Sequence, residues 1–342
     1  MSTPEVTILL PVYNAEEFIE EAIISILRQT YKNFTFLIIN DGSTDKTGEI
    51  ISKFKEKDSR IEYYQRTNKG LIDTLNEGIS LCRTELIARM DADDVAFPNR
   101  IERQVSFMNT HPEVSVCGTG MVYYETGKIN ILPASNDHLK IITLFSPPVF
   151  HPTVMMRRNA ILSIGGYKKT AYCAEDFDLW ERMIHSGFLF SNIQLPLLKY
   201  RVHLQKNRTF YHTQMEDTVH KIHARQLDRL GMPTDHKSLG VHLICCAPCR
   251  ETSRMIKIEK KWFEEIYVKN SIKKLFSEKI LQEELDFRFK QFTPIYFHKN
   301  PLLWIYRELR HFLNFKIADK FPKQAHIIKY FTFEIKKILR KL

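Results

Sequence analysis

The sequence predicts an α/β protein whose doubly wound, mostly parallel sheet is flanked by helices and followed by a helical, basic C-terminal extension. Apolar and helical segments alternate through the first 90 residues, polar clusters follow several of the apolar segments, and positive charge gathers near the end of the chain. Continuous apolar runs are typical of strands that are buried on both faces of a parallel sheet. The alternation therefore predicts parallel strands joined by helical crossovers.

The first part of the chain supplies most of this pattern. Segments rich in Val, Ile, Leu and Phe predict strands, whereas apolar residues three or four positions apart predict helices. Ligands of such sheets gather outside the carboxyl ends of the strands, so functional side chains are expected at residues 11–14, 41 and 91–94. The predicted strands cover residues 6–12, 35–39, 61–64 and 85–88, and the predicted helices cover residues 16–29, 47–57 and 71–82.

The rest of the chain is predicted to be less regular. Alternation is lost between Thr126 and Pro152, which predicts loops and mixed strand direction. Gly231-Met232-Pro233 is the best candidate boundary, because Gly and Pro interrupt regular structure, and the pattern beyond it is helical. Further helices are expected over residues 98–109, 176–185 and 215–230, and strands over 114–124, broken at Gly118 and Gly120, and over 197–203.

Composition favours a globular protein of a reducing compartment. The chain has 342 residues, of which 44% are hydrophobic, so a sizeable core is available. No apolar run reaches the roughly 18 residues that a spanning helix needs, and the first residues lack the basic and apolar regions of a signal peptide. The six cysteines form no disulfide framework. We therefore expect a cytoplasmic protein.

The net charge of +10 comes from the C-terminal tail, because residues 287–342 hold 13 Lys/Arg against 3 Asp/Glu. Between residues 328 and 342 the apolar side chains share one helical face and the basic side chains lie away from it, which is typical of an amphipathic helix. Nucleic acid, an anionic membrane surface and simple packing as a helical cap are three possible explanations. The tail contains no recognisable nucleic-acid-binding module, so membrane binding is favoured and no nucleic acid is expected.

Three aspartates, Asp91, Asp93 and Asp94, directly follow an apolar strand. Carboxylates this close repel one another unless a cation lies among them. Mg²⁺ is usually held by one or two carboxylates together with substrate phosphates, so the stretch predicts half of a metal-diphosphate site. The alternative is a solvated acidic turn before the helix that begins near Pro98. For Asp94, a structural role such as orienting Arg100 or capping that helix is favoured.

Seven short motifs in this order resemble family 2 of the inverting glycosyltransferases, which have the GT-A fold. The resemblance covers residues 5 to about 205 and implies a GT-A-like catalytic domain over residues 1–230, with a nucleotide-binding half over 1–95 and an acceptor-binding half over 96–230, before a mostly helical, basic region over 231–342. The motifs are Leu10-Pro11-Val12-Tyr13-Asn14, Asn40-Asp41-Gly42-Ser43-Thr44-Asp45, Asn68-Lys69-Gly70-Leu71, Asp91-Ala92-Asp93-Asp94, His151-Pro152-Thr153-Val154-Met155, Glu175-Asp176-Phe177-Asp178-Leu179-Trp180 and Tyr200-Arg201-Val202-His203.

The resemblance also implies a donor site for a nucleotide sugar, in particular a UDP-sugar. Asp41 would contact uracil, Asp91 the ribose or sugar, and Asp93, with His203 as a second contact, would hold Mn²⁺ or Mg²⁺. The alternatives are an Asx turn for Asp41 and an ordinary satisfied polar side chain for His203. Pro11, Val12 and Tyr13 would form a wall against the base, although they could simply end a strand. The remaining predicted donor contacts are Asn14, Asn68, Lys69, Gly70 and Ala92.

By the same resemblance, Asp176 is the general base that removes the proton of the acceptor hydroxyl. The alternative for Glu175-Asp176 is a pair of first-turn acids that the helix dipole stabilises. His151, Glu175 and Trp180 are assigned to the acceptor side, and Asp178 and Glu181 are expected to face solvent. The implied acceptor is a saccharide or lipid-linked saccharide of a bacterial surface glycan, used at the cytoplasmic face of the inner membrane.

The sequence leaves two alternative functions and one alternative metal site. A nucleotide-sugar-binding protein without catalysis would share the donor motifs, whereas a nucleotidyltransferase would carry a Gly-rich, basic loop that is absent after Leu10. Cys246 and Cys249, with His236 and His242 nearby, have a nominal zinc spacing. A single C-x-x-C motif is weak support for zinc, and idle thiols are favoured.

Overall fold

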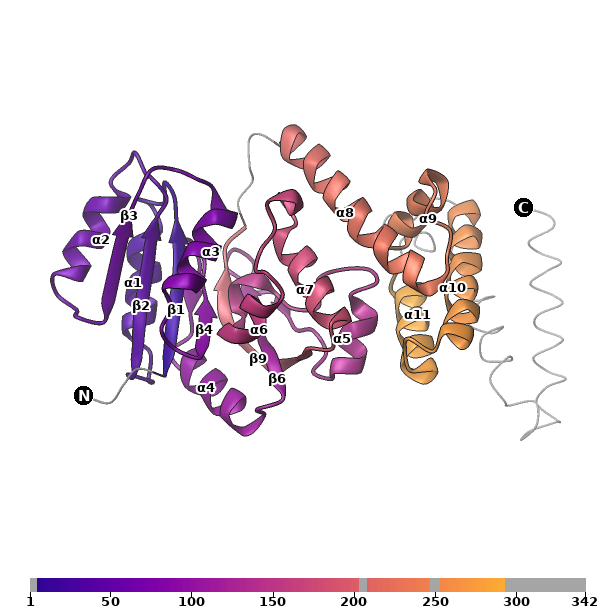
Figure 1. The fold of residues 1–342 in the computed structure, drawn as a ribbon, viewed down its shortest axis with the longest axis horizontal. Coiled ribbons are helices and arrows are strands. Elements are labelled where there is room, and N and C mark those ends of the chain that lie inside the picture. The colour runs from indigo at the N-terminus through magenta and orange to yellow at the C-terminus, as the bar shows by residue number, and fades with distance from the viewer. Residues whose placement is uncertain (1–4, 203–207, 247–252, 293–342) are drawn as a thin grey trace, which may run out of the picture.

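The structure, a computed structural model, describes residues 5–202, 208–246 and 253–292 (Figure 1). Its strands are β1 (Val6–Val12), β2 (Phe34–Asn40), β3 (Ile61–Gln65), β4 (Leu86–Arg89), β5 (Val95–Ala96), β6 (Val114–Tyr123), β7 (Ile129–Asn130), β8 (Met155–Arg157) and β9 (Leu189–Tyr200). Its α-helices are α1 (Ile19–Leu27), α2 (Thr47–Lys55), α3 (Leu71–Leu81), α4 (Arg100–Thr110), α5 (Asn136–Ile142), α6 (Arg158–Ser163), α7 (Glu175–His185), α8 (Arg208–Leu230), α9 (His236–Cys246), α10 (Ser253–Lys273) and α11 (Glu278–Phe292).

These strands form one sheet in the order β3-β2-β1-β4-β8-β6-β9-β5, and β7 pairs with β6. The pairs β1–β2, β2–β3 and β1–β4 are parallel, as the alternation predicted. Successive side chains of β1 enter different cores, because Ile8 and Leu10 pack with α1 and α2 whereas Leu9 packs with α3 and α7. The predicted α/β class, with helices on both faces of the sheet, is confirmed.

The second half of the sheet has mixed strand direction. β8 runs antiparallel to both β4 and β6, whereas β6 and β9 are parallel. The predicted break in β6 is wrong, since the strand continues through Gly118 and Gly120 and only its register with β9 shifts near Gly120. A Cβ atom on Gly118 would lie 2.2 Å from Oδ1 of Asn192, so this glycine permits the close approach of β9.

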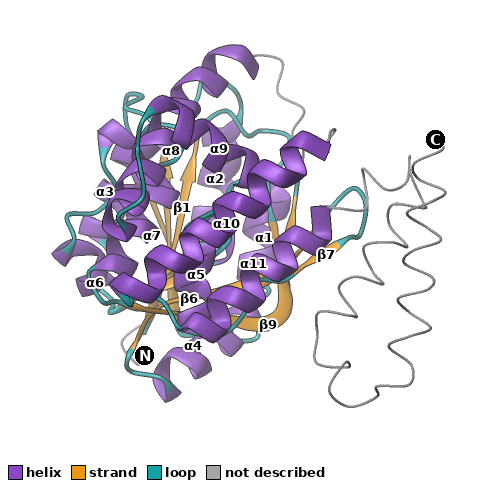
Figure 2. Ribbon diagram, turned by 90° about the vertical axis from the view of Figure 1, so that its right-hand side faces the viewer, coloured by secondary structure: helices purple, strands orange, loops and turns teal. Residues whose placement is uncertain are grey.

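The helices after β9 build a core of their own. Leu227 of α8, Trp262 of α10 and Leu281 of α11 pack together with Phe145, which follows α5. Figure 2 shows α10 and α11 side by side, in front of the sheet in that view. Within the described ranges, no helix is both long and apolar enough to cross a membrane. The basic tail from residue 293 onward lies outside these ranges.

Candidate active site

Polar residues meet at the carboxyl edge of the parallel strands. Asp41 directly follows β2, and its amide donates a hydrogen bond to the carbonyl of Val12, at the end of β1. The amide of Met90 likewise donates to Leu9 and carries the chain from β4 into Asp91. The ends of three neighbouring strands therefore lie at one edge, where such sheets bind their ligands.

The three aspartates after β4 form a compact cluster. One carboxylate oxygen from each of Asp91, Asp93 and Asp94 lies within 4.8 Å of the others. Asp94 is fully buried, and its Oδ1 accepts a hydrogen bond of 3.0 Å from the Arg201 amide. Its Oδ2 has no hydrogen-bond partner among the described residues. Burial and then the charge of Asp91 raise the pKa of Asp94 to about 8. An all-oxygen cluster with an unsatisfied buried oxygen fits Mg²⁺ or Mn²⁺.

A buried cation, Arg89, lies beneath this cluster. The sequence did not predict this residue. Its guanidinium forms an ion pair with both carboxylate oxygens of Asp91, and the residue is 2% exposed. Arg100 donates a 2.7 Å hydrogen bond to the Arg89 carbonyl. Burial nevertheless raises the pKa of Asp91 more than Arg89 lowers it. The only signal for Arg89 in the sequence was a basic residue inside an otherwise apolar strand.

Arg201 braces the aspartate loop from the side of β9. Its Nε donates to the carbonyl of Asp93 at 3.0 Å, and its guanidinium pairs with Glu21 and lies 3.9 Å from the ring centroid of Tyr124. Neither this set of contacts nor the backbone hydrogen bond to Asp94 was predicted. The sequence left open whether Arg201 pairs with a phosphate or with Glu175, and its described ion pair is instead with Glu21. His203, the predicted second metal contact, lies outside the described residues.

Glu175 and Asp176 lie in the first turn of α7. Burial raises the pKa of Asp176, and burial followed by the charge of Asp176 raises the pKa of Glu175 to about 7. The charge of Asp176 also contributes, after burial and nearer groups, to the raised pKa of Asp91. The two parts of the chain, 85 positions apart in sequence, therefore share one electrostatic environment.

On the donor side, Asp41 fixes the loop that contains the predicted contacts Asn68, Lys69 and Gly70. Its two carboxylate oxygens accept hydrogen bonds from the amides of Lys69 (2.9 Å) and Gly70 (2.8 Å). Its Oδ1 also pairs with Arg66 at 2.7 Å. The Asx-turn alternative is wrong for Asp41, because the side chain that accepts from the Ser43 amide belongs to Asn40.

The predicted base-binding wall is exposed only at one residue. Tyr13 is 51% exposed, whereas Pro11, Val12 and Ala92 are buried. Asn14 has a φ of 47°, a left-handed conformation that Asn tolerates, and its side chain accepts a hydrogen bond from the Thr44 amide. The two loops after β1 and β2 are thereby joined. Only Tyr13 and Asn14 of this group offer exposed side chains to a ligand.

One prediction for the acceptor side is wrong. Trp180 is fully buried and packs edge-on against His151 and Phe190, so this side chain belongs to the core and is not available to an acceptor. His151 is 8% exposed, and its Nε2 lies 2.7 Å from the hydroxyl of Tyr167. Burial and then the charge of Arg89 lower the pKa of His151, which is therefore neutral. His151 and Tyr167 form a neutral, buried layer beneath the acidic cluster.

Asp178 and Glu181 also differ from expectation. Both were expected to face solvent, yet Asp178 is 4% exposed and Glu181 is fully buried. Arginines of α7 and α8 surround them, so the polar face of α7 is an interface between helices. The sequence pattern of an amphipathic helix does not distinguish such an interface from a solvated face.

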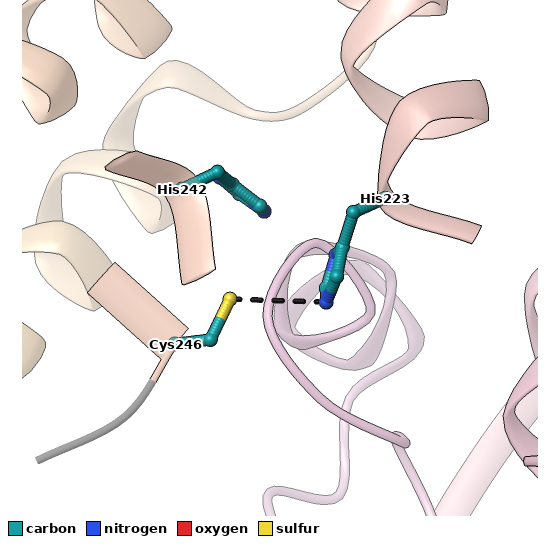
Figure 3. Close-up of side chains that lie close together, drawn as sticks. All are labelled: His223, His242 and Cys246. Carbon is teal, nitrogen blue, oxygen red and sulfur yellow. Dashed lines mark hydrogen bonds between the residues drawn. The ribbon is translucent and has the colours of Figure 1, made fainter. Parts of the chain in front are cut away.

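A second group of possible metal ligands lies among the C-terminal helices. Figure 3 shows His223 of α8 with His242 and Cys246 of α9, and their ligand atoms lie within 4.8 Å of one another. The indole of Trp262, which can only donate, donates to Nδ1 of His242 at 3.1 Å, so Nε2 must carry the proton that the Leu144 carbonyl accepts at 2.7 Å. Both ring nitrogens of His242 are thus engaged, and this cluster fits a hydrogen-bonded core better than a metal site. Cys249 lies outside the described residues.

Comparison with known proteins places this chain among the glycosyltransferases. Residues 7–172 match the model of the family described as glycosyl transferase family 2. EpsE of Bacillus subtilis, whose name describes it as a glycosyltransferase, is 37% identical over 207 residues, which are 58% of this chain and 74% of that protein. The protein belongs to glycosyl transferase family 2.

Two further relatives and two solved structures are similar. The O-antigen biosynthesis glycosyltransferase WbnJ of Escherichia coli is 31% identical over 58% of this chain and 80% of its own length, and the amylovoran biosynthesis glycosyltransferase AmsE of Erwinia amylovora is 30% identical over 57% and 75%. S. aureus TarS 1–349 in complex with UDP-GlcNAc superposes with a TM-score of 0.55 over 86% of this chain and 92% of that chain, at 15% identity. Mannosyltransferase PcManGT from Pyrobaculum calidifontis, in complex with GDP-Man and Mn²⁺, gives 0.53 over 82% and 86%, also at 15% identity. At this level of identity the two structures support the fold alone.

Replacing Asp93 with asparagine should weaken Mn²⁺ binding by about tenfold or more, because one anionic oxygen ligand is lost from the cluster. Titration calorimetry with Mn²⁺ in the presence of UDP measures this affinity. The matched control is Asp58→Asn, which removes an aspartate that pairs only with Arg60 on the same domain. Equal Mn²⁺ affinity in the two variants would contradict the assignment of the cluster as a metal site.

The buried histidines contribute a loss of stability in acid. The raised pKa values of Asp94 and Glu175 act in the opposite direction, so the histidine contribution is measured as a difference between variants. Burial lowers the pKa of His242 to about 4, and burial followed by the charge of His242 lowers the pKa of His223 to about 3. The unfolded chain takes up these protons near pH 6.5 whereas the folded chain does not, so stability present at pH 7 is lost as the pH falls below 6.5. At pH 5 the loss is about 2 kcal/mol for each histidine.

Urea unfolding at pH 7 and pH 5 measures the effect. The variant His242→Gln should lose less stability between the two pH values than the wild type, and the exposed control His236→Gln should behave like the wild type. If His242→Gln and the wild type show the same pH dependence, the assignment of this loss to His242 is wrong.

Proposed function

We propose that this glycosyltransferase uses a divalent metal and a UDP-sugar to transfer a hexosyl or N-acetylhexosaminyl residue, with inversion, to a saccharide or lipid-linked saccharide acceptor. The observation that carries the proposal is the meeting of two groups of carboxylates at the carboxyl edge of the sheet. Asp91, Asp93 and Asp94 supply a cation site, and Asp176 supplies a base that shares their electrostatic environment. Diphosphate departure and acceptor attack need these two functions at one place.

The donor is assigned to the loops after β1 and β2. The exposed ring of Tyr13 is suited to stack on a base, and Asn68 and Lys69 are exposed on the loop that Asp41 holds. We assign Asp41 a contact with uracil, made together with Arg66, because that carboxylate and guanidinium already lie side by side at the strand end. We propose a uridine nucleotide, the class of donor that is bound in TarS, a structure of similar fold solved with UDP-GlcNAc.

Asp93 and the unsatisfied Oδ2 of Asp94 would hold the metal, and Asp91, fixed by Arg89, would orient the ribose or sugar. When bound, the ion neutralises the charge that develops on the departing nucleoside diphosphate. Arg201 keeps the aspartate loop in place from behind, through the Asp93 carbonyl and the Asp94 carboxylate. The loop therefore does not have to reorganise when the donor arrives.

Asp176 is assigned as the general base. In a single displacement, the acceptor oxygen forms a bond to the anomeric carbon while the bond to the diphosphate breaks, and the hydroxyl proton passes to the carboxylate of Asp176. The bonding electrons leave with the nucleoside diphosphate. Burial makes Asp176 a stronger base than an ordinary aspartate because it raises the pKa. Glu175 lies beside it and is assigned to the acceptor side.

The acceptor is assigned to bacterial surface glycans because of the named relatives, which include an O-antigen and an amylovoran biosynthesis glycosyltransferase. We further propose that the basic, aromatic tail over residues 287–342, most of which follows α11, attaches the enzyme to the cytoplasmic face of the inner membrane. Apolar and aromatic side chains would enter the interface while Lys and Arg meet anionic headgroups. A lipid-linked acceptor would then be presented close to the active site.

The proposed activity predicts UDP release when one member of a panel of nucleotide sugars is incubated with Mn²⁺ and a saccharide acceptor. Asp176→Asn should lower transfer by about 100-fold or more while leaving the affinity for UDP and Mn²⁺ unchanged, because the base does not contact the diphosphate. Asp137→Asn, which changes an exposed first-turn acid of α5, is the matched control and should keep full activity. Full transfer by Asp176→Asn would remove the assigned base, and release of pyrophosphate in place of UDP would indicate a nucleotidyltransferase.

The proposed membrane role predicts that a chain ending at Phe292 loses binding to anionic vesicles. This end follows α11 and keeps the core residues Leu281 and Leu285, so the body of the protein should remain folded. Co-sedimentation with vesicles that contain phosphatidylglycerol, and with neutral vesicles as the control, measures binding. Equal co-sedimentation of the shortened and full chains with anionic vesicles would contradict the proposal.

A further inference from the structure

Helix α8 packs along the helix that carries the assigned base (Figure 1). Near the start of α7, the Thr218 hydroxyl donates to the carbonyl of Tyr172, and the buried Ile222 packs against Ala174 and Phe177. These contacts place α8 next to both residues that flank Glu175-Asp176. These contacts are one hydrogen bond and apolar packing. Further along the two helices, α7 and α8 are joined by ion pairs.

The ionic contact joins Arg225 of α8 to two buried carboxylates of α7. One guanidinium nitrogen, Nη2, donates to Asp178 Oδ1 and to Glu181 Oε2, at 2.8 Å in each case, and Nε donates to Glu181 Oε2 at 3.2 Å. The side chains of Asp178 and Glu181 are 6% and 0% exposed. Arg229 pairs with the other oxygen of Glu181. Arg225 thus bridges successive turns of α7.

The same network reaches the layer beneath the acidic cluster. Arg182 pairs with Asp178 at 2.8 Å and donates to the carbonyls of Ile164 and Gly166, at 2.8 Å and 2.7 Å. The next residue, Tyr167, is the one whose hydroxyl contacts His151. A continuous series of directional bonds therefore runs from α8 through α7 to the residues below the base.

Stability alone does not account for this arrangement. Removing two carboxylates from water costs free energy that ion pairs recover only in part, and apolar packing of similar volume is often at least as stabilising. Directional ion pairs differ from apolar packing in one respect, because they fix the rotation and the axial position of a helix. Asp178 lies two positions after Asp176, so fixing this turn of α7 also fixes the direction of the base.

We propose that Arg225 is a positioning residue for glycosyl transfer, which holds Asp176 in place through its bridge to Asp178 and Glu181. The inference rests on the proposed role of Asp176 as the base. It means that α8, which the chain reaches only after the last motif of the family resemblance, takes part in assembling the active site.

The test compares Arg225→Met, which keeps the aliphatic stem and loses the bridge, with Arg225→Lys and the wild type. Arg225→Met should lower kcat for transfer by about tenfold or more with donor KM and UDP affinity unchanged, because a displacement of about 1 Å can cost about 100-fold in rate. Arg225→Lys should restore part of the loss, since an ammonium group pairs with one carboxylate but lacks the planar fork. If Arg225→Met does not fold, the lysine variant decides, and its kcat should lie below the wild-type value.

Two controls separate positioning from general destabilisation. Arg288→Met removes an arginine that pairs with Glu284 within α11 and lies over the ring of Phe145. Neither partner belongs to α7, so the change should lower the melting temperature without lowering kcat. In the Asp176→Asn background, Arg225→Met should cause no further loss of the residual transfer measured with radiolabelled donor, because the residue acts through a base that is already absent.

Each outcome has a separate meaning. Unchanged kcat in Arg225→Met, or an equal loss with and without Asp176, overturns the positioning role while leaving the proposed function intact. Full transfer by Asp176→Asn overturns the assigned base and the positioning role together. A loss of kcat that disappears in the Asp176→Asn background supports both.

Discussion

Negative charge concentrated at a partly buried sheet edge is the constraint on which the rest of this structure depends. Asp91, Asp93 and Asp94 follow one strand within four positions, and Asp176 adds a further carboxylate from α7. Burial disfavours the charged forms of Asp91, Asp94 and Asp176, and with the charge of Asp91 it raises the pKa of Asp94 to about 8. Arg89, inside the sheet, pairs with Asp91 and offsets part of this repulsion. In the function proposed above, a divalent cation would offset more of the negative charge, both of the cluster and of the donor diphosphate.

Two groups of residues around the edge hold this arrangement in place, Arg201 on the side of β9 and the pair His151 and Tyr167 below it. The backbone amide and the Nε of Arg201 hold the aspartate loop. The guanidinium also pairs with Glu21 and lies over the ring of Tyr124. Below the loop, His151 and Tyr167 contact each other as neutral groups. A charged side chain in that layer would shift the pKa values of the aspartates above it, because electrostatic interactions are strong in a buried environment. Because His151 and Tyr167 are neutral, Arg89 is the main charge that acts on these aspartates from below.

The sequence predicted the elements whose pattern is local and missed the contacts that depend on distant segments. The strands at residues 6–12 and 61–64 were placed within a residue of their observed ends, because apolar runs between turn residues are a local signal. Trp180 belongs to a motif that was assigned to the acceptor side, yet its indole lies in the core. A motif fixes the position of a residue in the sequence but does not show where its side chain points. Asp178 and Glu181 were assigned to solvent because their covering helix begins more than 20 residues later, and periodicity carries no information about a partner.

The same reasoning changes how the C-terminal region is understood. Composition alone described it as basic and helical, which suggests an appendage to a finished domain. Instead, α5 contributes to the core of the C-terminal helices, and α8 places arginines on the buried acids of α7. The helix that carries Asp176 therefore lies between the sheet and these helices, and its direction depends on both.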